Sequence, residues 1–404
     1  MSKQEHLHWD SRSQPQALDW DARSPAALAD QIKAYDGMRR RCPVAYSDYL
    51  QWSLFSHGDV MRALTDHETF SNAVSTHLSV PNGMDPPQHT PYRQLIEPYF
   101  APDQMARFEP VCRRIAEDLV DALPAAGEVE LAGRFAQDFA LRIQCAFMGW
   151  PAELHEPLRR WTARNREATL AGDRQAMAQI ALDFDRYIRD QLNIRRAAGP
   201  DAADDLTTRL LRETIDGRAL SDEEIVSILR NWTVGELSTI SSCVGILAHY
   251  LAEQPDLQQR LREEPRLLPA AIDEILRIHA PLISNRRVAT RDVEIGGRQL
   301  KAGDRLTLIW ASANRDEAVF GDPDEFRLDR EPALNLLYGA GIHVCPGAPL
   351  ARLELRIVIE TLLAGTRRIS LAEGKAPVRA IYPAGGFASL PLWIEAAGPG
   401  PRQG

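Results

Sequence analysis

The sequence predicts a mainly α-helical fold with a small β part, and three observations support this prediction. Apolar residues recur at three- and four-residue spacing over several long segments. Only a few short segments alternate as strands do. The 404 residues are 44% hydrophobic and 25% charged, which is enough to bury a large core. Disordered chains, collagen and small disulfide-stapled scaffolds are therefore excluded.

Charge and cysteine content narrow the class of protein further. The formal net charge of −9 argues against a general nucleic-acid or anionic-membrane binder. Five cysteines, an odd number at wide spacings, do not form a disulfide framework. No stretch approaches the 18 consecutive apolar residues of a membrane span, and the start is polar. We therefore expect no membrane contact and a cytoplasmic location.

The two ends of the chain differ from its middle. Residues 1–20 are polar and are expected to form an N-terminal extension. Residues 398–404, GPGPRQG, are typical of a flexible tail or the start of a linker. Because no internal repeat or linker interrupts the middle, residues 21–397 are expected to form one domain.

Long amphipathic helices are predicted over 101–122 and 174–197. A helix of about 30 residues is predicted from Ser221 to Glu253, and Ser221 with Glu224 has the pattern of a capping box. Glycine and hydroxyl residues, which are weak helix formers, fill its centre. We therefore expect this helix to be distorted at a functional site.

The predicted strands are short and lie in the second half of the chain. Residues 293–300, VEIGGRQL, have the pattern of a hairpin, and 306–310, LTLIW, that of a further strand. These few strands are the small β part of the predicted fold.

One cysteine stands apart from the other four. Cys345 lies in a glycine-rich turn, YGAGIHVCPG, directly before an amphipathic helix. A helix N-terminus favours an anion, so we expect a stabilised thiolate there. A single thiolate without a second Cys or a His at metal spacing does not make a zinc site. It suits a metal whose other ligands come from a macrocycle, which points to haem.

The same segment carries a specific motif. The form F-G-x-G-x-H-x-C-x-G is matched by residues 338–347, with Tyr338 in place of Phe. On this motif the chain resembles the cytochrome P450 superfamily over essentially its whole length. The resemblance implies the cytochrome P450 fold, a single triangular α-rich unit with a long central distal helix. It also implies haem b as cofactor, with Cys345 as the axial metal ligand.

Two further sets of residues match the family's pattern. Glu274 and Arg277 lie three apart, and the resemblance implies that Arg330 joins them in a buried structural network. It also implies a cradle for the haem propionates, formed by His89, Arg93, Arg287 and His343. In this assignment Arg286 is the solvated neighbour of Arg287.

The long helix carries residues VGELST at 234–239, where the family has an acid and an alcohol that relay protons. The 35 residues from Thr239 to Glu274 favour Thr239 as the alcohol, which puts Ser238 at the acid position. The other register makes Ser238 the alcohol and Leu237 the acid position. Glu236 is the only carboxylate nearby. It either serves the relay through water or makes a structural hydrogen bond.

The resemblance implies a monooxygenase that inserts one oxygen atom from O2 into a small hydrophobic or aromatic substrate, by hydroxylation or by O-, N- or S-dealkylation. A peroxide-driven peroxygenase and a non-catalytic haem sensor are the alternatives. The substrate pocket is sketched by resemblance alone, and each of its residues could equally be core. The pocket residues would be Leu78, Val80, Val234, Leu282, Ile283 and Phe387.

The resemblance is strongest to haem domains of bacterial self-sufficient P450s, through segments such as RNWTVGELSTI. Electrons from NAD(P)H would arrive through a ferredoxin and ferredoxin reductase, or through a fused flavin and iron–sulfur reductase missing from this chain. Four arginines either form a basic docking face for an acidic ferredoxin or are ordinary surface charges. They are Arg113, Arg114, Arg352 and Arg356.

Overall fold

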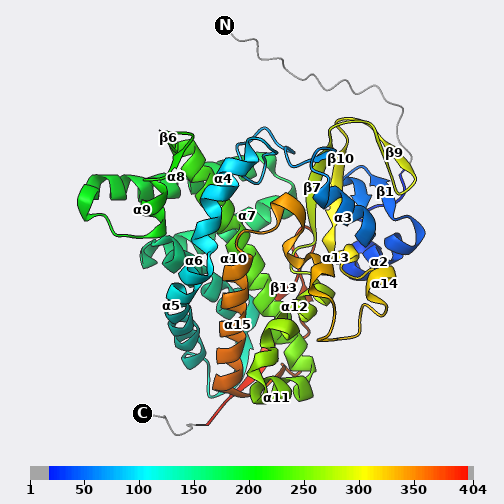
Figure 1. Ribbon diagram of the computed structural model, residues 1–404. Coiled ribbons are helices and arrows are strands. Elements are labelled where there is room, and N and C mark those ends of the chain that lie inside the picture. The colour runs from blue at the N-terminus through cyan, green and yellow to red at the C-terminus, as the bar shows by residue number, and fades with distance from the viewer. Residues whose placement is uncertain (1–17, 399–404) are drawn as a thin grey trace.

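Helices make up most of the computed structural model, which describes residues 18–398 (Figure 1). This confirms the predicted fold, mainly α-helical with a small β part. No helix in this range is both long and apolar enough to cross a membrane. The helices are α1 (Pro25–Ala29), α2 (Gln31–Arg41), α3 (His57–Thr65), α4 (His89–Ile96), α5 (Pro102–Asp121), α6 (Gln137–Met148), α7 (His155–Ala171), α8 (Arg174–Ala198), α9 (Leu206–Leu210), α10 (Asp222–Glu253), α11 (Pro255–Glu263), α12 (Leu268–His279), α13 (Trp310–Ala313), α14 (Glu317–Phe320) and α15 (Ala348–Gly365).

The largest sheet lies on one side of the molecule, beside α2 and α3 (Figure 1). Its order is β1 (Val44–Ser47), β2 (Gln51–Leu54), β10 (Arg305–Ile309), β7 (Ser284–Ala289) and β3 (Phe70–Ser71). A three-stranded sheet joins β11 (Thr366–Leu371), β14 (Pro391–Ala396) and β4 (Ala126–Glu130). Three two-stranded pairs complete the β part: β5 (Thr214–Ile215) with β6 (Arg218–Ala219), β8 (Val293–Ile295) with β9 (Arg298–Leu300), and β12 (Val378–Arg379) with β13 (Phe387–Ser389).

The 32-residue helix α10 passes through the middle of the fold (Figure 1). The capping box is present: the Ser221 hydroxyl accepts from the Glu224 N–H, and the Glu224 carboxylate accepts from the Ser221 N–H. The predicted distortion is absent, because α10 is an uninterrupted α-helix. Two of its hydroxyls bond back along the helix, Thr233 to the Leu229 carbonyl (2.8 Å) and Ser238 to the Val234 carbonyl (3.1 Å).

Packing explains why α10 tolerates its weak central residues. The largest apolar core of the protein lies between α5, α6, α10, α12 and α15. A second apolar core lies between α10, α7 and α8. Burying one large aliphatic side chain stabilises a fold by about 1.5–3 kcal/mol. Helix propensities differ by less than about 1 kcal/mol per residue, so burial dominates.

The last residues of the predicted N-terminal extension belong to the folded core. Trp20 is buried and packs edge-on against Phe55, with ring centroids 5.2 Å apart, and against Tyr35. The rest of the predicted extension, 1–17, and residues 399–404 of the predicted tail lie outside the described residues.

A buried carboxylate on α12 ties distant segments together. Glu274 accepts two hydrogen bonds from Arg277 (2.8 and 2.9 Å) and one from Arg330 (2.8 Å). Arg277 also donates to the carbonyls of Asn314 and Pro323. The structure therefore brings together the Glu–Arg residues that the sequence pattern grouped.

The pKa of Glu274 depends on the two arginines that it binds. Burial alone would raise the pKa of Glu274, but the hydrogen bonds and charges of Arg277 and Arg330 outweigh it, and the net shift is downward. A carboxyl with a lowered pKa stabilises the fold above its unfolded pKa, and this contribution is lost as the pH falls through the folded value.

We expect Glu274→Gln to lower the free energy of unfolding by about 3–5 kcal/mol, because it leaves the Arg277 charge buried without its partner. Urea titration followed by far-UV circular dichroism measures this change. Asp292→Asn is the matched control, since Asp292 forms an exposed ion pair with Lys301. Equal urea midpoints for wild type and Glu274→Gln would contradict a structural role for the network.

Candidate functional site

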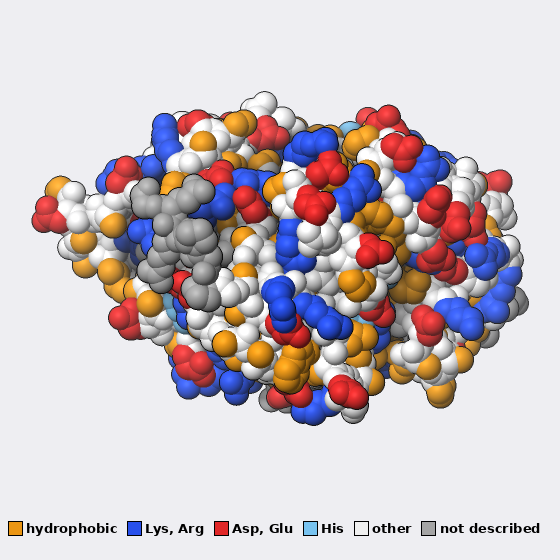
Figure 2. Space-filling view, turned by 90° about the horizontal axis from the view of Figure 1, so that it is seen from below, with side chains coloured by type: hydrophobic (Ala, Val, Ile, Leu, Met, Phe, Trp, Pro, Cys, Tyr) orange, Lys and Arg blue, Asp and Glu red, His pale blue; other side chains and the backbone are white. Residues whose placement is uncertain are grey.

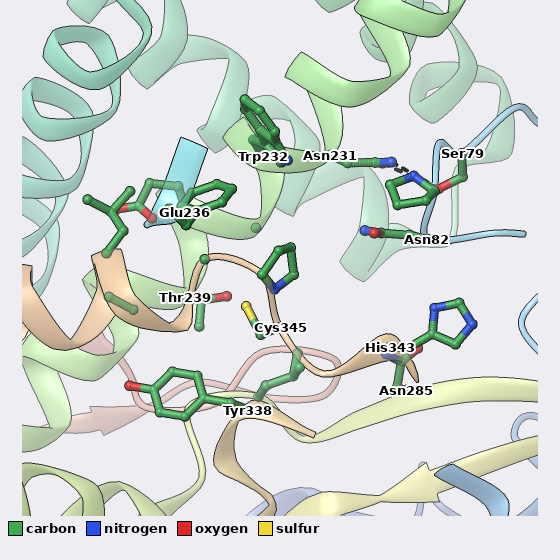
Figure 3. A pocket seen from close by; sticks show the side chains of 18 of the residues that line it. Ser79, Asn82, Asn231, Trp232, Glu236, Thr239, Asn285, Tyr338, His343 and Cys345 are labelled. Carbon is green, nitrogen blue, oxygen red and sulfur yellow. Dashed lines mark hydrogen bonds between the residues drawn. The ribbon is translucent and has the colours of Figure 1, made fainter. Parts of the chain in front are cut away.

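A cavity of about 580 Å³ separates the middle of α10 from the loop 338–347 that precedes α15 (Figure 3). Cys345 lines it from the loop, and Thr239 and Glu236 line it from α10. Figure 3 shows Thr239 and Cys345 facing the same space, with Glu236 and His343 on opposite sides of it. The cavity is the place where the residues selected from the sequence meet.

The loop before α15 has a conformation that needs its glycines. Gly339 and Gly341 have φ values of 76° and 70°, which other residues rarely adopt. A Cβ atom on Gly341 would lie 2.5 Å from the Leu64 carbonyl oxygen, so the loop could not approach α3 with a larger residue. The Cys345 N–H donates to the Tyr338 carbonyl (2.8 Å), which closes the turn. The result is a fixed sulfur position.

The sulfur of Cys345 is open to the cavity but enclosed by protein on its other sides. The backbone N–H groups of Gly347 and Ala348 hydrogen-bond it. They lower the thiol pKa, yet burial outweighs them and the net shift is upward. The N–H groups at the start of the helix thus favour the thiolate, as expected, but their effect is smaller than that of burial. The α-helix itself begins at Ala348.

Four basic side chains gather at one end of the cavity. The rings of His89 and His343 lie with centroids 4.5 Å apart. Arg93 donates to the Val344 carbonyl (2.6 Å) and also pairs with Glu97. Within residues 18–398 the buried Nε2 atoms of both histidines have no hydrogen-bond partner.

Arg287 lies behind this cluster and acts on it electrostatically. Its side chain is 2% exposed and donates to the Arg286 carbonyl (2.7 Å), and it has no ion pair with any described residue. Burial lowers its pKa to about 10, so it stays charged at neutral pH. Arg286 is exposed and lines the cavity, which Arg287 does not.

Charge near the two histidines favours an anion. Burial, followed by the nearby His89 and Arg287, lowers the pKa of His343 to about 3, and burial also lowers that of His89. The nearest carboxylate is Asp85, 3.9 Å from His343, and it already accepts hydrogen bonds from Ser71 and Asn72. The cluster therefore has positive charge and unused donors to offer a bound carboxylate.

The position of the cavity along α10 decides whether Thr239 or Ser238 is the alcohol that faces it. Thr239 lines the cavity, whereas Ser238 does not and donates to the Val234 carbonyl (3.1 Å). Leu237 is buried in the core. Thr239 is thus the hydroxyl that faces Cys345.

The six apolar pocket positions fall in different environments. Leu282 alone among them lines the cavity. Val80 and Ile283 are buried, Phe387 packs on the main core and on His249, and Leu78 and Val234 are exposed.

The cavity wall also contains polar residues that sequence reasoning missed. Ser79 and Asn82 line it from the loop between β3 and α4, Asn231 from α10 and Asn285 from β7 (Figure 3). The Asn231 amide donates to the Ser79 hydroxyl (3.2 Å) and the Val80 carbonyl (3.0 Å). No sequence spacing links this loop to Asn231 or Asn285, since only the tertiary fold brings them together.

The arginines of the predicted docking face are largely ion-paired. Arg113 and Arg356 both bind Glu109 and Glu360, at 3.0–3.6 Å. Arg352 pairs with Asp273 (3.2 Å). Figure 2 shows the same pattern on the face that it displays, where basic and acidic side chains are interspersed.

Comparison with known proteins gives consistent matches. The family model described as "Cytochrome P450" matches residues 150–368. Putative cytochrome P450 YjiB of Bacillus subtilis is 31% identical over 81% of this chain and 85% of that protein. Erythromycin C-12 hydroxylase of Saccharopolyspora erythraea is 31% identical over 85% and 90%, respectively.

Solved structures agree. The open cytochrome P450 EryK of S. erythraea superposes with a TM-score of 0.83 at 28% identity, covering 93% of this chain and 98% of that one. A P450 of Bacillus megaterium in complex with testosterone has a TM-score of 0.80 at 26% identity, covering 90% and 99%. With the cavity, the cysteine loop and these matches together, the chain belongs to the cytochrome P450 family of haem-thiolate monooxygenases.

Proposed function

We propose that this P450 binds haem b with Cys345 as the protein ligand of the iron. The observation that carries the proposal is the Cys345 sulfur, held by a glycine loop and open to an internal cavity. Among residues 18–398 no group of three or more His, Cys, Asp or Glu could hold a metal ion. A single thiolate therefore fits a metal whose other ligands come from a macrocycle.

The basic cluster fits the two carboxylate groups of such a macrocycle. His89 and His343 have unused buried nitrogen atoms, and Arg93 and Arg287 supply positive charge. Carboxylates at this end would receive charge-assisted hydrogen bonds. We assign the four residues to holding and orienting the haem.

When bound, the haem supplies the activation of O2 and the insertion of one oxygen atom into the substrate. Thr239 places a hydroxyl opposite the Cys345 sulfur, where it can hold water and pass protons into the cavity. Ser238 faces away from the cavity, so we assign the relay to Thr239 and to Glu236 one turn before it.

The substrate we propose is a small hydrophobic or aromatic molecule, undergoing hydroxylation or dealkylation. Leu282, Trp232 and Phe100 give the cavity apolar surface, while Asn82 and Asn285 add polar groups to its wall. A substrate that carries an oxygen function beside its apolar body fits this wall. Two similar proteins are named as a linalool 8-monooxygenase and an erythromycin C-12 hydroxylase.

The remaining assignments rest on family resemblance. We propose that NAD(P)H supplies the electrons through a ferredoxin and its reductase or through a flavin and iron–sulfur reductase, and that the protein acts in the cytoplasm. Stoichiometric NAD(P)H consumption in the presence of such partners tests the first assignment. Faster turnover with hydrogen peroxide alone would favour the peroxygenase alternative instead.

Cys345→Ser is expected to abolish the strongly red-shifted Soret band of the ferrous–CO complex, because the thiolate ligand is lost. The reduced, CO-treated protein is compared by absorption spectroscopy with Cys42→Ala, a half-buried cysteine that does not line the cavity. A red-shifted band that survives in Cys345→Ser would show that another residue is the ligand.

Arg287→Leu is expected to weaken haem retention about tenfold, because losing the buried positive charge near His343 removes about 1.4 kcal/mol of electrostatic attraction for a bound carboxylate. Haem transfer to apomyoglobin measures retention, with Arg286→Leu as the neighbouring control. The same change removes an unpaired buried charge, so the apoprotein should unfold at an equal or higher urea concentration. Unchanged haem transfer with a destabilised apoprotein would instead indicate a purely structural role.

Thr239→Ala should lower the product formed per NAD(P)H several-fold, because the relay loses the hydroxyl that faces the cavity. Ser238→Ala is the matched control and should leave this ratio unchanged, since its hydroxyl is bonded back to Val234. Parallel measurement of product and NAD(P)H checks both variants. The opposite result would assign the relay to Ser238.

A further inference from the structure

Two buried carboxyl groups meet between α10 and α15, and the proposed function uses only one of them. Glu236 is 9% exposed and Glu354 is 0% exposed. Their carboxyl groups lie within hydrogen-bonding reach of each other, and the contact becomes a hydrogen bond once one of them is protonated. Neither Glu354 oxygen, nor Oε1 of Glu236, finds another hydrogen-bond partner within the described range. This contact joins the cavity wall to the helix that begins just after Cys345.

In the part of the chain that the structure describes, no cation shifts the pKa of either carboxyl group. Cys112 from α5, Cys243 from α10 and Cys345 from the loop lie close enough to act on the pair electrostatically, and burial raises the pKa of each. Asp273 on α12 adds a further acid near Cys243.

The nearest arginines are already committed. Arg113 and Arg356 act on Cys112 from the α5–α15 surface, but they are bound to Glu109 and Glu360. Two adjacent negative charges without a partner cannot be accommodated in such a site. The pair must therefore hold at least one proton.

Electrostatics indicate which carboxyl holds it. Burial raises the pKa of Glu236 to about 7, while the hydrogen bond to Glu354 acts in the opposite direction. Burial and the charge of Glu236 raise the pKa of Glu354 well above its ordinary value. The larger upward shift is that of Glu354, so the proton that the pair retains lies mainly on Glu354. A pair of neighbouring acids titrates as one unit.

We propose that Glu236 and Glu354 form a carboxylic acid dyad that stores a proton at the cavity wall for delivery towards Thr239. The proposal deepens the proposed function and rests on it. In the transfer, Glu236 gives its proton to a water or hydroxyl on the cavity side, and the dyad goes from neutral to one negative charge. The proton that remains on Glu354 hydrogen-bonds this charge. Solvent later returns the lost proton.

This arrangement assigns different roles to the two residues. Glu236 lines the cavity one helical turn before Thr239 and is the donor. Glu354 does not line the cavity, so it acts through Glu236 and is a positioning residue. The proton on Glu354 stabilises the negative charge that forms on Glu236. Glu236 can therefore release its proton although no cation among the described residues compensates that charge.

Infrared spectroscopy of the haem-loaded protein tests the dyad directly. The carbonyl stretch of buried protonated carboxyl groups should be present at neutral pH and should shift in D2O. Part of it should disappear as the pH rises through about 7, when Glu236 loses its proton. Glu236→Gln should remove this titrating part and keep the constant part from Glu354.

Variants of Glu354 test whether the two carboxyl groups share a proton or only pack against each other. Glu354→Gln should remove the constant part and leave the Glu236 midpoint near 7, because an amide still donates. Glu354→Leu cannot donate, so the Glu236 midpoint should rise. Glu360→Gln on the same helix is the matched control, since its carboxylate is paired with Arg356 and contributes no protonated band.

The proposal would be overturned if neither Glu236→Gln nor Glu354→Gln removed a band of protonated carboxyl groups. An unchanged Glu236 midpoint in Glu354→Leu would overturn the positioning role. The ferrous–CO Soret band, recorded on the same samples, reports folding and Cys345 ligation independently. Loss of the dyad is therefore distinguishable from failure of the proposed function.

Discussion

The position of the cysteine loop depends on one buried carboxylate. Glu274 on α12 binds Arg330, which lies 15 residues before Cys345, and Arg277 holds the backbone near Asn314. Asn314 in turn accepts from the Leu336 N–H, at the start of the loop. The chain is thus anchored to α12 before it turns, so the sulfur position follows from a charge network far from the cavity. Removing any member releases the segment that presents the reactive atom.

Local sequence signals predicted the parts of the site that depend on local structure. The cysteine motif, the capping box of α10 and the Glu–Arg spacing each reflect a turn or a helix of the chain itself. Three features required the tertiary fold. Burial reversed the expected direction of the Cys345 pKa shift, and packing kept α10 regular. Glu354 has the sequence pattern of an ordinary surface glutamate on an amphipathic helix, but in the fold α10 covers it. The polar wall of the cavity likewise comes from three separate segments.

The cavity is electrostatically divided. Arg93 and the buried Arg287 place positive charge near His343, and the buried acids Glu236 and Glu354 lie on the opposite side, where Figure 3 shows Glu236. The first end offers charge to a bound anion, and the second holds exchangeable protons. A cofactor with carboxylates on one edge would direct that edge to the first end. The proton-holding acids would then lie at the end away from its carboxylates.

The ion-paired cluster of Arg113, Arg356, Glu109 and Glu360 joins α5 to α15 and has no net charge. A surface of this kind exerts little long-range attraction on a charged protein approaching through solvent. Recognition of an electron donor at this face would then depend on shape and on short-range contacts formed after encounter. The association rate would vary little with ionic strength, and partner choice would be decided by how long the complex lasts.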